Sequence, residues 1–164
     1  MSTDTDRIQK RVVLRAPLER VWGAVSDATQ FGSWFGVAFD GPFVTGRVMK
    51  GKVVPTTVDA EIAKTQEAYA GAAFDFTVER IDPMTLFSFR WHPFAVDAKV
   101  DYSGEPTTLV TFELSTVPGG TRLTITETGF DGIPAARRAK AFEMNDHGWT
   151  MQAELLEKYV NRAL

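Results

Sequence analysis

The sequence contains no cysteine, which excludes disulfides, thiolate zinc sites, iron–sulfur clusters and a cysteine nucleophile. It has only two histidines, His92 and His147, and neither has carboxylates around it at the spacing of metal ligands, so we expect no metal site. No apolar run is long enough to span a bilayer, and residues 1–10 are too polar for a signal peptide. These absences predict a soluble protein of a reducing compartment, the cytoplasm.

A positive charge excess is also lacking. The formal net charge is −3, and the lysines and arginines are dispersed along the chain, so we expect no nucleic-acid partner and no membrane insertion. The glycines form neither G-x-x-x-x-G-K-[ST] nor G-x-G-x-x-G, and no serine lies in G-x-S-x-G. We therefore expect no cofactor, and the residues contain no recognisable catalytic constellation.

The length of the chain fits one domain. Its 164 residues are too few for two well-packed cores, so we expect a single domain over 1–164. A chain of this size removes roughly 70% of its unfolded surface from water, which is enough to fold unaided. Residues 1–7 are expected to be disordered, and residues 56–72 lack strand alternation and are expected to form a loop or a helix.

The remaining residues follow two periods. Alternation of apolar and polar residues predicts strands at 8–15, 37–43 and 46–54, and then two hairpins that turn at 82–85 and 118–120. Gly41 and Gly51 are candidate bulges. Apolar residues at helical spacing predict short helices at 18–25 and 28–35 and a long helix within 134–164, about 45 Å in length.

Consecutive strands joined by tight turns are antiparallel, which excludes a doubly wound fold. One face of the sheet carries too many aromatic residues to remain exposed, and only the long helix offers an apolar stripe of matching length. The sequence therefore predicts an α+β fold in which a curved antiparallel sheet of about seven strands wraps round the C-terminal helix. Two short helices lie between the first and second strands.

Nine aromatic residues are expected to converge between the sheet and the helices. Each one alone is more typical of a core than of a binding surface. Rigid rings that meet from several elements fill space imperfectly, so together they predict a cavity, on the order of 300 Å³ or more, for a small apolar molecule. The expected cavity-lining aromatics are Phe31, Trp34, Phe74, Phe76, Phe87, Phe89, Trp91, Phe112 and Trp149.

Glu127 is the unexpected residue on the inward face, because it shares strand parity with Leu123 and Ile125. An unpaired buried charge is costly, so Glu127 needs partners, water or a ligand. Asn145 and Asp146 precede Trp149 by four and three residues, and with Glu127 they can form a polar end of the cavity. Alternatively, the strand frays before Gly129 and Glu127 lies at the rim of the sheet.

The two histidines are interpreted as ordinary structural residues, His92 on the wet face of the sheet or in a loop. His92 shares strand parity with Ser88 and Arg90, on the face opposite to the aromatic residues. His147 precedes Gly148 on the long helix and is expected to be an ordinary surface or hydrogen-bonded histidine.

Several segments together resemble the SRPBCC or START-like (Bet v 1-like) superfamily, and within it the Aha1-like group of Hsp90 ATPase activators. The matching segments are residues 16–22, 31–35, 78–83 with Leu86 and Trp91, 120–124, Gly129-Phe130, Gly148-Trp149, and Leu155, Leu156 and Tyr159. The resemblance covers nearly the whole chain except 56–72, and it implies the helix-grip fold. It brings no shared catalytic residues, because the matching positions are chiefly packing and turn positions.

Three functions are compatible with these observations. The first is a small-molecule binding domain with an internal cavity for an apolar or lipid-like ligand. The second, implied by the resemblance, is an interaction module of the Aha1 type whose partner is a chaperone or another protein. The third is a cyclase-like enzyme in which Glu127 or Asp146 acts as acid or base beside a bound ring.

Overall fold

A computed structural model describes residues 6–97 and 99–161. Seven strands form one antiparallel sheet in the order β1-β7-β6-β5-β4-β3-β2, so β1 and β2 are its edges. The strands are β1 (Arg7–Leu14), β2 (Val37–Phe39), β3 (Val48–Val53), β4 (Ala73–Asp82), β5 (Leu86–Trp91), β6 (Thr108–Val117) and β7 (Gly120–Thr128). The helices are α1 (Leu18–Ser26), α2 (Ala28–Phe35), α3 (Ala60–Gln66), α4 (Ala135–Val160) and the short 3₁₀ turns η1 (Glu67–Tyr69) and η2 (Phe130–Gly132).

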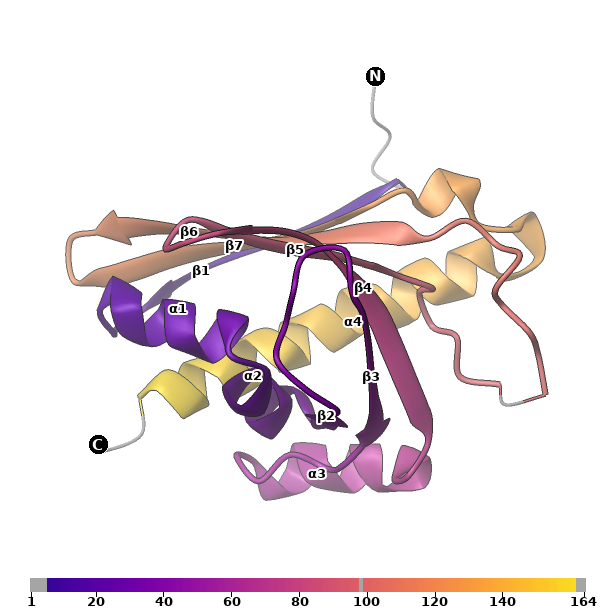
Figure 1. Cartoon of the computed structure of the whole chain (residues 1–164), viewed down its shortest axis with the longest axis horizontal. Coiled ribbons are helices and arrows are strands. Elements are labelled where there is room, and N and C mark those ends of the chain that lie inside the picture. Colours follow the sequence, from indigo (N-terminus) through magenta and orange to yellow (C-terminus); the bar gives the residue numbers. More distant parts are fainter. Residues whose placement is uncertain (1–5, 98, 162–164) are drawn as a thin grey trace.

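Helix α4 runs along one face of the sheet, with α1 and α2 beside it on the same side (Figure 1). The sheet bends so that β3 and β4 turn away from the other strands and carry α3 at their ends. This arrangement is the predicted helix-grip fold. No helix of the part that the structure describes is long and apolar enough to cross a membrane.

The core lies between the sheet and α4. In β6 and β7, buried residues alternate with more exposed ones, as expected for a sheet with one covered face. The buried residues of α4 are Ala141, Trp149, Leu155, Leu156 and Val160. Phe142 is only half-buried and packs its ring against Phe130 at 5.1 Å.

The bend of the sheet arises at a different place from the one expected. The register of β2 and β3 is continuous through Gly51, and Gly41 lies after β2, so neither glycine forms a bulge. The register shifts instead in β4, between Val78 and Arg80. Gly51 allows close packing, because a Cβ there would lie 2.3 Å from the carbonyl oxygen of Ala38.

Residues 56–72 contain α3 and η1. The carboxylate of Asp59 caps α3 by accepting hydrogen bonds from the backbone N–H groups of Glu61 and Ile62. Gln66 fixes the other end, because its side chain accepts from Thr56 N and donates to the carbonyl oxygen of Phe35. The segment thereby attaches to the end of α2.

The predictions for the two ends of the chain can be compared with the structure only in part. Residues 1–5, within the segment expected to be disordered, lie outside the described residues, whereas Arg7 belongs to β1 and pairs with Thr128. The predicted terminal helix is observed as α4, and residues 162–164 lie outside the description.

Candidate ligand-binding site

Glu127 lies fully inside the protein, as its strand parity predicted. Its exposed fraction is 0%, and in the sheet it pairs with Ile8 of β1 and Val110 of β6. Strand β7 continues to Thr128, so the strand does not fray before this position. The alternative that Glu127 lies at the rim of the sheet is therefore wrong.

Four side chains donate hydrogen bonds to the Glu127 carboxylate. Trp149 Nε1 donates to Oε1 over 2.8 Å, and Asn145 Nδ2 lies 3.0 Å from Oε1 and 3.2 Å from Oε2. Trp91 Nε1 and the Thr108 hydroxyl donate to Oε2 over 2.7 and 2.6 Å. All acceptor directions of both oxygens are thus used within the protein. No ion pair of the described residues includes this carboxylate.

The four donors come from three elements. Trp91 ends β5, Thr108 begins β6, and Asn145 and Trp149 lie one turn apart on α4. The carboxylate therefore joins α4 to the sheet where both ends of the long connection 92–107 meet. Thr108 was not predicted, although it shares strand parity with Val110 and Phe112, which was the available signal.

Asp146 does not join this cluster. Its carboxylate pairs with Lys10 Nζ at 2.9 Å, and about half of the Asp146 side chain, 49%, is exposed. Successive helical residues differ by about 100° in direction, so the position after Asn145 points past the edge of the sheet.

The connection between β5 and β6 is also anchored to α4. Arg137 donates to the Glu105 carboxylate over 2.8 and 2.6 Å and to the carbonyl oxygen of Pro93 over 2.7 Å. Its guanidinium group also lies 4.8 Å from the centroid of the Tyr102 ring. The fork of the guanidinium thus fixes several points of the connection beside the Glu127 cluster.

The predicted aromatic residues do meet in the core. Phe76 and Phe89 stack at 4.1 Å, and Trp149 lies 5.6 Å from Trp91 and 5.7 Å from Phe112. Phe31 is central, with eight rings at 4.8 to 6.3 Å: Trp34, Phe35, Phe39, Phe43, Phe76, Phe87, Phe89 and Phe112. Phe35, Phe39 and Phe43 were not predicted members.

These ring contacts bear on the predicted cavity. Most of the rings are buried, while Phe74 and Trp91 are half-buried. The distances between the ring centroids given above are typical of aromatic rings in direct contact. A ligand-sized space among Trp34, Phe76, Phe89, Phe112 and Trp149 therefore requires these rings to move apart, and the internal cavity stays a prediction.

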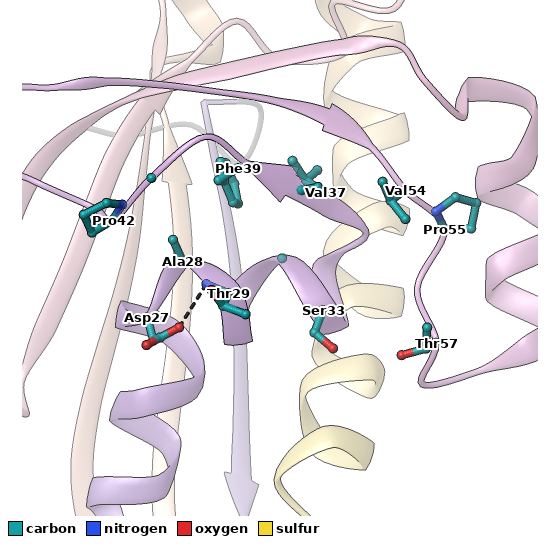
Figure 2. Close-up of a pocket in the computed structure, with 13 residues that line it drawn as sticks. Asp27, Ala28, Thr29, Ser33, Val37, Phe39, Pro42, Val54, Pro55 and Thr57 are labelled. Carbon is teal, nitrogen blue, oxygen red and sulfur yellow. Dashed lines mark hydrogen bonds between the residues drawn. The ribbon is translucent and has the colours of Figure 1, made fainter.

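An open pocket of about 520 Å³ lies elsewhere, between α2, β2 and the segment 54–57 (Figure 2). None of the predicted site residues lines it. Its lining residues are Asp27, Ala28, Thr29, Gly32, Ser33, Val37, Ala38, Phe39, Gly41, Pro42, Val54, Pro55 and Thr57. Single-sequence periodicity gave no signal for this pocket, because it forms between segments that are distant in the chain.

The pocket has apolar walls and a few polar groups. Phe39 and Val37 of β2 face α2, and the hydroxyls of Ser33 and Thr57 point toward one another (Figure 2). Asp27 caps α2 and accepts a hydrogen bond from Thr29 N over 2.9 Å. Only a glycine fits at position 32, since a Cβ there would lie 2.0 Å from the carbonyl oxygen of Val37.

Phe39 connects the pocket to the buried rings. Its ring centroid lies 5.3 Å from that of Phe76, 5.9 Å from that of Phe74 and 6.0 Å from that of Phe31. Phe74 in turn lies 6.0 Å from Trp91, which donates to Glu127. A continuous row of aromatic rings thus leads from the open pocket to the buried carboxylate.

The histidines take no part in either site. His92 Nε2 lies 3.1 Å from the carbonyl oxygen of Glu105, and His147 is exposed on α4. Within residues 6–97 and 99–161, no group of three or more His, Cys, Asp or Glu residues is placed to hold a metal ion.

Solved structures with the same fold are numerous. A protein from Arthrobacter aurescens matches with a TM-score of 0.72 at 18% identity, over 99% of this chain and 91% of its own. Protein MLL2253 from Mesorhizobium loti matches with a TM-score of 0.69 at 20% identity, over 96% of this chain and 98% of its own. The Aha1 dimer from Colwellia psychrerythraea matches with a TM-score of 0.64 at 17% identity, over 94% and 95%.

Identities this low establish the fold alone. No curated protein matches the chain. The profile of one family, described as "Activator of Hsp90 ATPase homolog 1-like protein", matches residues 15–161, which is nearly the whole chain. The chain therefore belongs to the Activator of Hsp90 ATPase homolog 1-like family.

Proposed function

We propose that this protein binds a small apolar molecule, which enters at the pocket between α2 and β2. The observation that carries the proposal is that Phe39 lines the open pocket and also contacts the buried aromatic cluster. A volume of about 520 Å³ lies within the range of small-molecule sites. Family membership supports a ligand-binding or Aha1-type domain in general, and the pocket supports the ligand-binding alternative of the two.

The walls of the pocket indicate the kind of molecule. Val37, Phe39, Val54 and Pro55 offer apolar surface, and the exposed fraction of Val54 is 50%. A flat or chain-like apolar ligand covers this surface, while a polar end meets the hydroxyls of Ser33 and Thr57. We expect the internal cavity, where it opens, to extend this pocket past Phe39.

In this proposal Glu127 does not contact the ligand but holds the aromatic residues behind the pocket in place. By accepting from Trp91 and Trp149 it fixes the orientation of two indole rings at the far end of the aromatic row. The same saturation disfavours Glu127 as the acid or base of the cyclase-like alternative, because such a group needs a free position toward its substrate. The carboxylate is fully buried, and both of its oxygens already accept hydrogen bonds. Asp146, the other candidate, pairs with Lys10 and is about half exposed, away from the aromatic cluster.

Ligand binding can be tested with 8-anilino-1-naphthalenesulfonate and with dodecanoate, measured by calorimetry and by thermal melting. We expect micromolar binding and a melting temperature that rises with ligand concentration by mass action. Replacing Thr29, an exposed lining residue, by Trp fills the pocket and should weaken binding about tenfold or more. The control Thr150→Trp adds the same ring at an exposed position of α4.

Two results would contradict the proposal. One is equal binding by wild type and Thr29→Trp, which places the ligand elsewhere. The other is the absence of binding across a chemically varied set of apolar molecules, which leaves the Aha1-type interaction module as the better function.

A further inference from the structure

Strand β1 is an open edge of the sheet. All of its residues from Arg7 to Leu14 pair with β7 on one side. On the other side, its backbone forms no hydrogen bond with any residue that the structure describes. An unpaired strand edge is a ready template for another strand, and natural proteins protect such edges or use them.

The exposed face along this edge carries a row of arginines. Arg7 and Arg11 point outward from β1, Arg15 follows the strand directly, and Arg122 of β7 lies opposite Val13, between Arg11 and Arg15. We call these four residues the arginine row. At about 3.3 Å per residue the row is about 26 Å long. The chain as a whole has a net charge of −3, so the row concentrates the opposite sign.

The arginine row differs from the arginines at the other end of the same face. Arg80 pairs with Asp82 at 2.7 Å and Arg90 with Glu79 at 3.1 Å. None of the four arginines of the row forms an ion pair within the described part of the chain. The exposed residue Glu113 of β6 is the acidic residue in line with Arg11, but Thr124 of β7 lies between the two, and they form no ion pair.

One end of the row meets a second open hollow. It has a volume of about 550 Å³ and lies where the chain leaves β1 and beside the β6–β7 hairpin. Arg15 lines it together with Leu18, Glu19 and Val117. The exposed fraction of Val13, in the middle of the row, is 47%. The outer face along the edge thus offers positive charge with apolar surface between and beside it, whereas the Lys10–Asp146 pair lies on the inner face, toward α4.

We propose that the β1 edge binds an extended acidic segment of a partner protein. Added as a strand beside β1, such a segment forms backbone hydrogen bonds to the open edge. A strand directs alternate side chains to one face, so acidic residues at every second position lie over the arginine row. We expect the partner to be a polypeptide, because the free N–H and C=O groups of β1 pair best with the backbone of another strand. The positive charge also lies along the direction of that strand.

The proposal can be tested with a labelled peptide, acetyl-EVEVEVEVE-amide, and fluorescence anisotropy. Binding should weaken as salt is added, because part of the attraction is electrostatic. The double variant Arg11→Glu with Arg122→Glu should weaken binding about tenfold or more. The control Lys50→Glu with Lys52→Glu makes the same charge change on exposed positions of β3, and it should bind as wild type does.

Three outcomes overturn the proposal. Equal binding by the peptide with N-methylated backbone amides shows that no strand is added. Equal weakening by the β3 variant shows a general charge effect rather than a site. Binding of phosphatidylserine vesicles in the absence of peptide binding assigns the arginine row to a membrane surface. None of these results depends on ligand binding at the α2–β2 pocket.

Discussion

At the scale of single residues, Glu127 is a fully buried carboxylate that accepts hydrogen bonds from four side chains. A buried carboxylate without a cation is stable only where donors replace the lost water. Two indoles, an amide and a hydroxyl do so here, over 2.6 to 3.2 Å. The donors depend on the carboxylate in turn. An indole N–H can only donate, so each of the two tryptophans needs an acceptor inside the protein.

Replacing Glu127 by Gln tests this dependence. The amide keeps the shape but presents N–H groups to one pair of donors, which leaves them unsatisfied. We expect the free energy of unfolding to fall by about 2 to 4 kcal/mol, measured by urea denaturation. The control Glu113→Gln, at an exposed position of β6, should leave the midpoint nearly unchanged. Equal midpoints for the two variants would show that the cluster contributes little to stability.

Predictions for single residues were correct where the repeat of a strand or a helix alone decides the direction of the side chain. Strand parity alone placed Glu127 inward, and helical spacing placed Asn145 on the side of Trp149. Asp146 was misplaced, because the position after Asn145 is turned by about 100° round α4, past the edge of the sheet, where Asp146 pairs with Lys10. Thr108 was overlooked because it follows a long connection without alternation.

At the scale of elements, α3 shows what local sequence leaves open. The composition of 56–72 allowed a helix, yet seven residues are too few to be stable alone. The helix persists because Asp59 caps it and also pairs with Lys158 of α4, while Gln66 attaches it to α2. Such tertiary contacts were invisible to periodicity, and so was the pocket that forms beside them.

The Asp59–Lys158 pair stabilises the fold only within a certain pH range. The hydrogen bond from Lys158 lowers the pKa of Asp59 below its ordinary value of 3.8, with help from the N–H of Ile62. The same hydrogen bond raises the pKa of Lys158 above 10.5. The stabilisation linked to Asp59 is complete above pH 3.8 and disappears as the pH falls through the lowered pKa. That linked to Lys158 is complete below pH 10.5 and disappears as the pH rises through the raised pKa.

We therefore expect an NMR titration of the Asp59 carboxyl group to give a midpoint below 3.8. Replacing Lys158 by Met removes the donor and should move this midpoint upward. The control Lys64→Met removes an exposed positive charge from α3 itself and should leave the midpoint of Asp59 close to that of wild type. Unchanged midpoints in both variants would show that the pair does not persist in solution.

At the scale of the whole molecule, the fold was predictable because every level of the sequence favours the same arrangement. Tight turns fix antiparallel neighbours, and the inward aromatic residues need a cover, which α4 gives together with α2. The place of the bend was not predictable. It follows from the register shift between Val78 and Arg80, which no glycine marks.

The last prediction concerns how α4 holds the molecule together. Leu156 has an exposed fraction of 0% and belongs to the single core that joins α4 to the sheet and to α1 and α2. Leu156→Ala should cost about 2 to 5 kcal/mol, because a cavity replaces the lost contacts. Since one core serves all elements, tryptophan emission and far-ultraviolet circular dichroism should report the same lowered midpoint. The exposed control Glu154→Ala should not shift it. Two separate transitions, with the sheet unaffected by the variant, would show instead that α4 can detach while the sheet stays folded.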